Sequence, residues 1–286
     1  MATDLVQTLS ELVAIPSVNP MGRGLTGPEF LESRVTDYLE AKFRAWGLTC
    51  QRQTVEPQRD NIVARLDGTT PVADGGPLIM FEAHQDTVPV DGMTIPPWTP
   101  TVRDGRIYGR GSCDIKGGMT AMLGAIERLI RERPARMPTI VMACSVNEEH
   151  GYSGAKELCD LWQTPGDVFP RAPDAAVIAE PTQLQVVVAH KGTLRWRCRT
   201  HGKAVHSSQP QLGDNAIYRM GPVLAALDRY QREQIPLRGE HPLCGPGSLS
   251  VGTVRGGISV NTVPDECVIE IDLRIIPGEI DEQAVE

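Results

Sequence analysis

Histidine and carboxylate side chains, the usual ligands of catalytic metal ions, occur in four short segments of the sequence. In the first, His84 and Asp86 follow an apolar run at residues 78–81 that is typical of a strand. Side chains at strand ends line the ligand crevice of open α/β sheets. Two residues apart on an extended segment, the pair would point the same way, as a zinc ligand and the carboxylate that orients its ring. Taken alone, a His-x-Asp pair is more often part of an ordinary loop.

The second segment is the glycine-rich stretch 109–118, which leads into a predicted helix. It has neither the spacing of a dinucleotide-binding glycine motif nor the ending of a phosphate-binding loop. Its glycines favour tight turns that would hold Asp114 at the mouth of a site. The alternative is that Asp114 caps the helix in an ordinary glycine turn.

The third and fourth segments also place carboxylates after apolar runs. Glu148 and Glu149 follow the run at residues 140–146, and Glu180 follows the run at residues 175–179. Two adjacent carboxylates at the end of a buried strand are costly unless a cation or a proton compensates their charge. One of the two glutamates could bind metal while the other serves as general base.

Four successive strand ends therefore each present a histidine or a carboxylate. Converging on one edge of a crevice, these side chains would form a metal site of imidazole and carboxylate ligands. The sequence contains no Gly-x-Ser-x-Gly motif, which weakens the alternative of a serine hydrolase.

Helices and strands alternate along the first two thirds of the chain. Apolar residues at helical spacing predict helices at residues 3–15, 27–46 and 116–131. Apolar runs predict strands at residues 61–66, 77–83, 139–146 and 175–179. This alternation is typical of an α/β fold with a mostly parallel sheet flanked by helices.

After about residue 190 the pattern changes to that of a small α+β domain. A strand at 192–201 and a helix at 214–234 precede strands at 248–255 and 267–276, which indicates one antiparallel sheet covered by a helix. Residues 279–286 resemble the first turns of another helix. The chain is thus expected to contain two domains, residues 1–188 and residues 189–286.

The composition excludes several classes of protein. With 286 residues, 41% of them hydrophobic and 22% charged, the chain is an ordinary globular protein and not a disordered one. A net charge of −8 argues against a nucleic-acid partner. No apolar run approaches the roughly 18 residues of a membrane span, and no secretory signal is visible. The seven cysteines are an odd number without a C-x-x-C pair, which favours reduced thiols in a cytoplasmic protein.

The motifs, in this order, resemble the co-catalytic zinc hydrolases of the acetylornithine deacetylase, succinyl-diaminopimelate desuccinylase, aminoacylase and carboxypeptidase G family. The resemblance extends from the first predicted helix to residue 286. It rests on His84-Gln-Asp86, on residues 104–118, on Glu148-Glu149-His-Gly and on Ala179-Glu180-Pro. It implies a zinc-exopeptidase-like catalytic domain in residues 1–188 and an inserted dimerisation or lid domain in residues 189–286.

The resemblance also implies a site of two metal ions. Asp114 would bridge two zinc ions, His84 and Glu180 would complete the first site, and Glu149 would belong to the second. Cobalt or manganese could take the place of zinc. The peptide bond after the bridging aspartate, Asp114–Ile115, is expected to be cis.

Catalytic roles follow from the same resemblance. Glu148 would act as general acid and base, and Asp86 would orient His84. His206 resembles a histidine that reaches the site of a neighbouring subunit and stabilises an oxyanion, which implies a homodimer. Asn261 and Arg274 resemble residues that hold a substrate carboxylate. Without the resemblance, His206 reads as a polar turn residue and Arg274 as half of a salt bridge.

The implied substrates are N-acyl amino acids, whose amide bond a metal-activated water would cleave. Small peptides with a free carboxylate, cleaved by a metallo-exopeptidase, are the alternative. Family chains continue beyond this length and supply a further histidine to the second metal, a part that His241 cannot play because it lies in the small domain. The sequence is therefore expected to be a C-terminally truncated member, and a third hypothesis is an inactive fragment that acts only in dimerisation.

Overall fold

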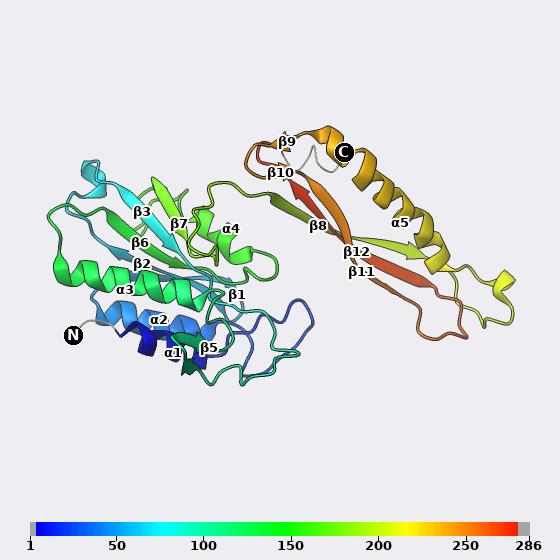
Figure 1. Ribbon diagram of the computed structural model, residues 1–286, viewed down its shortest axis with the longest axis horizontal. Helices are drawn as coiled ribbons and strands as arrows, with labels where there is room; N and C mark the ends of the chain where they lie inside the picture. The colour runs from blue at the N-terminus through cyan, green and yellow to red at the C-terminus, as the bar shows by residue number, and fades with distance from the viewer. Residues whose placement is uncertain (1–3, 280–286) are drawn as a thin grey trace. The chain divides into compact units, whose positions relative to one another are not determined.

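The computed structural model describes residues 4–279 of the chain (Figure 1). It consists of two compact units, Met1–Leu184 and Gln185–Glu286, which are described one at a time. The division lies close to the boundary expected after residue 188, and by itself it assigns no function to either part. The helix expected over residues 279–286 lies outside the described residues, apart from its first position.

A five-stranded sheet forms the centre of the first unit, in the order β1-β2-β6-β3-β7. Its strands are β1 (Thr49–Glu56), β2 (Arg59–Leu66), β3 (Leu78–Glu82), β6 (Thr139–Cys144) and β7 (Ala175–Ile178). Strand β3 pairs in parallel with both β6 and β7, whereas β2 pairs antiparallel with β1 and β6. Four of the five strands therefore run in the same direction, which confirms the predicted mostly parallel sheet.

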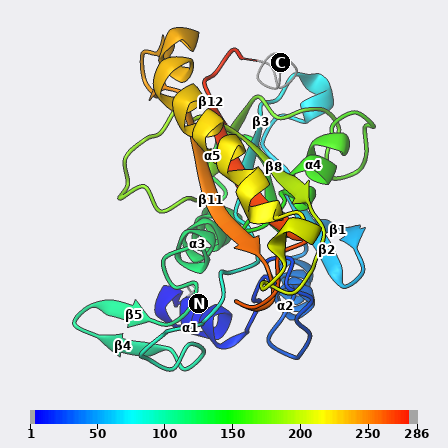
Figure 2. The ribbon, with the colours of Figure 1, turned by 90° about the vertical axis from the view of Figure 1, so that its right-hand side faces the viewer.

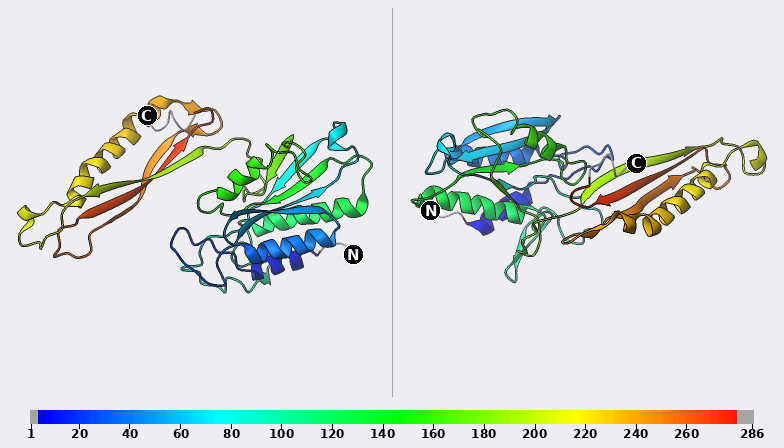
Figure 3. Two further views of the ribbon diagram at one scale, coloured as in Figure 1. Left: turned by 180° about the vertical axis from the view of Figure 1, so that it is seen from behind. Right: turned by 90° about the horizontal axis from the view of Figure 1, so that it is seen from above.

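Helices cover both faces of this sheet (Figure 3). Helices α1 (Leu5–Ala14), α2 (Ser33–Ala45) and α3 (Lys116–Glu132) lie on one face, and α4 (Ser153–Asp160) lies on the other. Every residue of β6 is buried, as its continuous apolar sequence predicts for a strand covered on both sides. The carboxyl end of β6 thus emerges from a buried core, whereas every residue of β7, at the edge of the sheet, is exposed.

Several elements of the first unit differ from the sequence-based prediction, which did not include α4 or the two hairpin strands within residues 101–108. Strand β1 was not predicted, because its sequence is mostly polar and it lies at the edge of the sheet. Helix α2 begins at Ser33 and not near residue 27, because Leu31 has a φ of 63° and interrupts the helical conformation. Glu32, which precedes α2, is consequently turned inward and fully buried.

The second unit contains a three-stranded antiparallel sheet in the order β11-β12-β8. Its strands are β8 (Gly192–His201), β11 (Ser248–Gly256) and β12 (Glu266–Ile275). Helix α5 (Ala216–Glu233) packs on one face through a core that includes Met220 and Ile269 (Figure 2). This arrangement confirms the predicted small α+β domain.

Short elements complete the described chain. They are the hairpin strands β4 (Thr101–Arg103) and β5 (Arg106–Tyr108), the strands β9 (Glu240–His241) and β10 (Gly245–Pro246), and the 3-10 helices η1 (Val72–Asp74), η2 (Pro210–Leu212) and η3 (Ile235–Arg238). Over residues 4–279, no helix combines the length and apolar character needed to cross a membrane. All seven cysteines are free thiols.

A buried lysine joins α1 to α3. Lys116, the first residue of α3, is only 1% exposed. Its Nζ donates hydrogen bonds to the backbone carbonyls of Leu12, at 2.9 Å, and Ile15, at 2.7 Å, where α1 ends. The Leu12 carbonyl also accepts from the N–H of Ile15 at 3.2 Å, whereas the Ile15 carbonyl lies past the end of the helix and receives its hydrogen bond from Lys116. Burial lowers the pKa of the Lys116 ammonium to about 7.

We predict that Lys116→Met destabilises the first unit by about 1–3 kcal/mol, because it leaves the partly buried Ile15 carbonyl without a hydrogen-bond donor while keeping most of the side-chain volume. The shift of the urea unfolding midpoint, followed by circular dichroism, measures the effect. Lys156→Met, at an exposed position of α4, is the matched control and should change stability by less than about 0.5 kcal/mol. Equal midpoints for the two variants would show that the Lys116 hydrogen bonds contribute nothing.

Candidate metal centre

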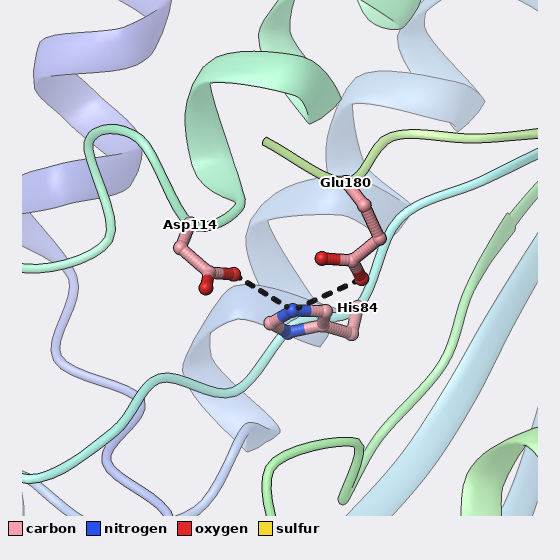
Figure 4. Close-up of side chains that lie close together, drawn as sticks. All are labelled: His84, Asp114 and Glu180. Atoms are coloured by element: carbon pink, nitrogen blue, oxygen red, sulfur yellow. Dashed lines mark hydrogen bonds and ion pairs between the residues drawn. The ribbon is translucent and has the colours of Figure 1, made fainter. Parts of the chain in front are cut away.

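Three residues from separate segments of the first unit meet at one point (Figure 4). They are His84, Asp114 and Glu180, and one potential ligand atom of each lies within 4.8 Å of the others. The Nε2 atom of His84 is 3.2 Å from Oδ1 of Asp114 and 3.8 Å from Oε1 of Glu180. The structure thus brings together the three side chains that the sequence predicted as ligands of one metal.

The parallel pairing of β3 and β7 explains why His84 and Glu180 meet. Glu82 is paired with Ile178 at the end of the ladder, and the N–H of Ala179 donates to the carbonyl of Glu82 at 2.9 Å. His84 and Glu180 each lie two residues beyond this last pair. Since alternate residues of a strand share a face, both side chains project from the same face at the same level of the sheet.

A tight turn before α3 brings Asp114 to the same point. Gly111 has a φ of 81°, and a Cβ at this position would lie only 2.8 Å from Cγ2 of Thr87. The turn therefore packs against the segment that follows His84, and only glycine suits it. The Asp114–Ile115 peptide bond is cis, as the resemblance implied.

Glu148 and Glu149 follow β6 and reach the same region. The Oε2 atom of Glu148 lies 3.9 Å from Nε2 of His84. The Oε1 atom of Glu149 accepts a hydrogen bond from the N–H of Val88 at 3.1 Å. The two adjacent glutamates therefore border the cluster from the β6 side, one beside the imidazole and the other held by the segment after β3.

Asp86 is buried directly behind His84. The Nδ1 atom of His84 is 2.9 Å from the backbone carbonyl oxygen of Asp86 and 3.6 Å from its carboxylate. The carbonyl is therefore the hydrogen-bond partner that orients the ring, and the carboxylate adds a negative charge nearby. The carboxylate itself accepts hydrogen bonds from the N–H groups of Glu148 and Glu149, each at 3.1 Å.

The negative charge of the cluster exceeds its positive charge. Burial lowers the pKa of His84, but its hydrogen bond to Asp114 and the charges of Asp86, Glu148 and Glu180 outweigh burial and raise the pKa to about 10. Burial raises the pKa of Glu149 to about 7. A protonated imidazole thus provides the positive charge among these acids.

The donor set fits a divalent transition-metal ion. One imidazole nitrogen and several carboxylate oxygens converge within a few ångströms, and such mixed sets bind zinc, cobalt or manganese. A cation at this point would compensate the same charges that now raise the pKa of His84. The chemistry of the side chains is therefore that of a metal centre.

The second unit holds the other three predicted site residues, His206, Asn261 and Arg274, and it places Arg274 apart from the other two. The segments of His206 and Asn261 lie side by side, because His206 forms an isolated bridge with Thr262 and the N–H of Ser207 donates to the carbonyl of Asn261 at 2.9 Å. Arg274 lies near the opposite end of β12, where its Nε donates to Asp272 at 2.6 Å.

The length of β12 sets the distance between these groups. Glu266 begins β12 on the side of Asn261, and Arg274 lies eight residues further along the strand, about 26 Å away at 3.3 Å per residue. Within one copy of the chain, Asn261 and Arg274 therefore cannot contact the same small carboxylate.

Comparison with known proteins shows the family of this chain. Residues 80–279, which include every predicted site residue, match peptidase family M20/M25/M40. The chain belongs to this family.

Relatives of this M20 chain include enzymes that act on acylated amino acids by name. A probable succinyl-diaminopimelate desuccinylase of Staphylococcus aureus is 30% identical over 273 residues, with 86% of this chain and 64% of the relative covered. An acetylornithine deacetylase of Vibrio campbellii is 30% identical over 251 residues, with 86% of this chain and 62% of the relative covered. The M20 chain thus spans less than two thirds of the length of these relatives.

Solved structures share the fold of the M20 chain. An M20 family metallo-carboxypeptidase from Sulfolobus solfataricus has a TM-score of 0.79 at 18% identity, and the match covers 99% of this chain and 74% of that one. A dinuclear metal-binding peptidase of the M20 family from Bacillus subtilis has a TM-score of 0.58 at 17% identity, covering 98% of this chain and 66% of that one.

Sequence analysis missed two asparagines that contact the site of this M20 chain. Asn19 donates a hydrogen bond to the carboxylate of Asp86, and Asn147 precedes the glutamate pair. Asn147 directly precedes the Glu148-Glu149-His-Gly motif, and this position could have identified it as part of the site. Asn19 lies in a loop far from every motif, and nothing in its local sequence indicates a role.

Replacing Glu180 by glutamine should stabilise the metal-free protein. Burial and the negative charges of Asp114, Glu82 and Asp86 raise the pKa of Glu180 despite the nearby imidazole of His84, so its charged form is disfavoured in the folded protein. We expect the thermal unfolding midpoint in a chelating buffer to rise by about 1–3 °C, a small shift because solvent screens a side chain that is 40% exposed.

The control for this variant is Glu157→Gln, at an exposed position of α4, which should leave the midpoint unchanged. A midpoint that falls for Glu180→Gln would contradict the interpretation that the carboxylates repel one another in the absence of a cation.

Proposed function

We propose that this chain forms the greater part of a metal-dependent hydrolase that cleaves the amide bond of N-acyl amino acids. The observation that carries the proposal is the convergence of His84, Asp114 and Glu180 on one point beside two glutamates. Relatives named as a desuccinylase and a deacetylase support an acylated amino acid as the substrate. Because the chain spans less than two thirds of their length, the activity of the whole protein is part of the proposal.

His84, Asp114 and Glu180 would hold one metal ion, and Asp114 and Glu149 would contribute to a second. When bound, such ions supply Lewis acidity and a water molecule whose pKa is about 7. The protein residues keep the imidazole in place through the Asp86 carbonyl and keep Glu149 in place through the N–H of Val88. These contacts hold the ligands in position before any metal binds.

Glu148 is the proposed general base and acid. Its carboxylate lies beside the predicted ligands, and 38% of its side chain remains exposed, which leaves it open to a substrate and to a water molecule. Burial raises its pKa, so it more readily accepts a proton from the attacking water. It would then pass this proton to the leaving amine.

The second unit would complete the site through a homodimer. His206, exposed on its loop, would donate a hydrogen bond to the developing oxyanion in a neighbouring copy. Asn261 on the adjoining segment before β12 and Arg274 at the far end of β12 would contact one substrate only from different copies. This separation supports the dimer, because the two residues cannot cooperate within one chain.

A metallo-exopeptidase is the second candidate. A probable carboxypeptidase of Aspergillus flavus is 32% identical over 276 residues, with 93% of this chain and 62% of the relative covered. The same metal site would then cleave the amide bond of a small peptide, and Arg274 would bind its terminal carboxylate. A chain that only dimerises, without activity, is the non-enzymatic alternative.

The functional proposal is tested by loading the purified protein with zinc or cobalt and measuring hydrolysis of N-succinyl and N-acetyl amino acids and of dipeptides. We expect at least one acylated amino acid to be hydrolysed with a kcat/KM more than tenfold above that for every dipeptide. Preference for dipeptides would support the exopeptidase. Metal binding without turnover of any of these substrates would contradict the hydrolase proposal.

Glutamine substitutions separate the roles of the two glutamates. Glu148→Gln should retain the wild-type zinc content but reduce kcat by about 100-fold or more, since the base is lost while the predicted ligands remain. Glu149→Gln should instead lower zinc content or affinity. Zinc content after dialysis, measured together with kcat, distinguishes the two, and equal zinc loss in both variants would show that the roles are assigned wrongly.

A further inference from the structure

A buried polar network lies behind the glutamate pair. It contains Asn19, Glu32, Arg59 and Asn147 together with Asp86, and all five side chains are buried. Apart from Asp86, none of these residues takes part in the proposed chemistry. Burying so many polar groups is costly unless their hydrogen bonds are satisfied. The hydrogen bonds of the network therefore favour one arrangement of the chain around it.

Three consecutive backbone N–H groups donate hydrogen bonds to buried carboxylates. The N–H of Asn147 donates to Oε1 of Glu32 at 3.2 Å. The N–H groups of Glu148 and Glu149 donate to the two carboxylate oxygens of Asp86, each at 3.1 Å. Hydrogen bonds to a charged acceptor are stronger than those between neutral groups. The backbone that carries both glutamates is therefore fixed at every residue.

Asn19 joins the two ends of this arrangement. Its Nδ2 donates one hydrogen bond to Oδ2 of Asp86 at 2.7 Å and another to Oδ1 of Asn147 at 2.9 Å. Its Oδ1 accepts from the N–H of Met21 at 2.9 Å, which fixes the orientation of the amide. A single side chain thus bridges the Asp86 carboxylate and the residue that starts the glutamate turn.

The far side of the turn is anchored by an ion pair. Nε and Nη2 of Arg59 donate to the two carboxylate oxygens of Glu32 at 3.0 and 2.9 Å. Asn147 itself has a φ of 60°, a conformation that non-glycine residues adopt infrequently and that its surroundings must hold. Its Nδ2 also donates to Oγ of Ser153 at 2.8 Å, so the side chain is bonded at both ends.

We propose that Asn19 is a positioning residue for the Glu148–Glu149 pair, holding Asp86 and Asn147 together so that Glu148 lies beside His84 and Glu149 against the N–H of Val88. The inference deepens the proposed function, on which its catalytic consequence rests, whereas its structural consequence can be measured without any metal. Loss of the Asn19 amide would free the Asp86 carboxylate to rotate, and the N–H groups of the glutamate pair would lose their fixed acceptor.

The test is hydrogen–deuterium exchange at the backbone amides of residues 147–149 in the metal-free protein. In Asn19→Leu, which keeps the branched shape and the number of heavy atoms of the side chain but has no amide, exchange at these positions should be at least tenfold faster than in the wild type. Ser17→Ala is the matched control. Ser17 lies in the same loop and donates a buried hydrogen bond to the carbonyl of Gln85 at 2.8 Å, but it touches neither Asp86 nor Asn147 through its side chain. Exchange at residues 147–149 should change less than threefold in this control.

If Asn19→Leu does not fold, Asn19→Ser replaces it, because a hydroxyl can donate to only one of the two acceptors and should give an intermediate acceleration. Unchanged exchange at residues 147–149, or an equal acceleration across the whole first unit, would overturn the positioning role. In zinc-loaded protein that hydrolyses substrate, Asn19→Leu should lower kcat about tenfold with KM within twofold of the wild type. A protein with no turnover at all would defeat the proposed function, and the exchange result would still decide the role of Asn19.

Discussion

Repulsion among the carboxylates around His84 is the main physical constraint on the candidate metal centre of the first unit. Asp86, Asp114, Glu148, Glu149 and Glu180 surround a single imidazole, and burial raises the pKa of Glu148, Glu149 and Glu180. Such a cluster is unfavourable without a cation, and clusters of groups with strongly perturbed pKa values are typical of functional sites. The charges cannot spread apart, because the sheet and its turns fix the chain on which each one is carried.

The sheet concentrates these charges through its topology. Strands β3, β6 and β7 run parallel, so the segments after them leave the same edge of the sheet. His84, the glutamate pair and Glu180 follow these three strands, and the turn before α3 adds Asp114. Buried backbone and amide donors then hold the acids, with the N–H groups of the glutamate pair on Asp86 and the N–H of Val88 on Glu149. Neutral hydrogen-bond donors thus stabilise part of the negative charge of the cluster, and a bound metal ion would compensate the rest.

The second unit has a sheet with one apolar and one charged face. One face of its sheet packs on α5, and the other carries cross-strand ion pairs, such as Arg195 with Asp272 and Arg197 with Glu270. Exposed pairs of this kind add little stability, but they keep an uncovered sheet face polar. The unit presents Asn261 and Arg274 at opposite ends of one strand, a separation suited to contacts in two different places and not to one binding pocket within a single copy.

Local signals in the sequence, namely apolar runs and helical spacing, determined the α/β class and the antiparallel second domain. The histidine and carboxylates in four short segments indicated a candidate metal site, and the resemblance to the zinc hydrolases selected His84, Asp114 and Glu180 among them as ligands of one metal. Strand β1 and the start of α2 escaped prediction, since β1 is a polar edge strand and Leu31 adopts an unusual φ. The tertiary structure alone decided that the carbonyl of Asp86 orients His84, that Asn19 bridges Asp86 and Asn147, and that Asn261 lies far from Arg274. These relations join residues that lie far apart in the chain or depend on which backbone group a side chain meets, and only the folded packing fixes such distances.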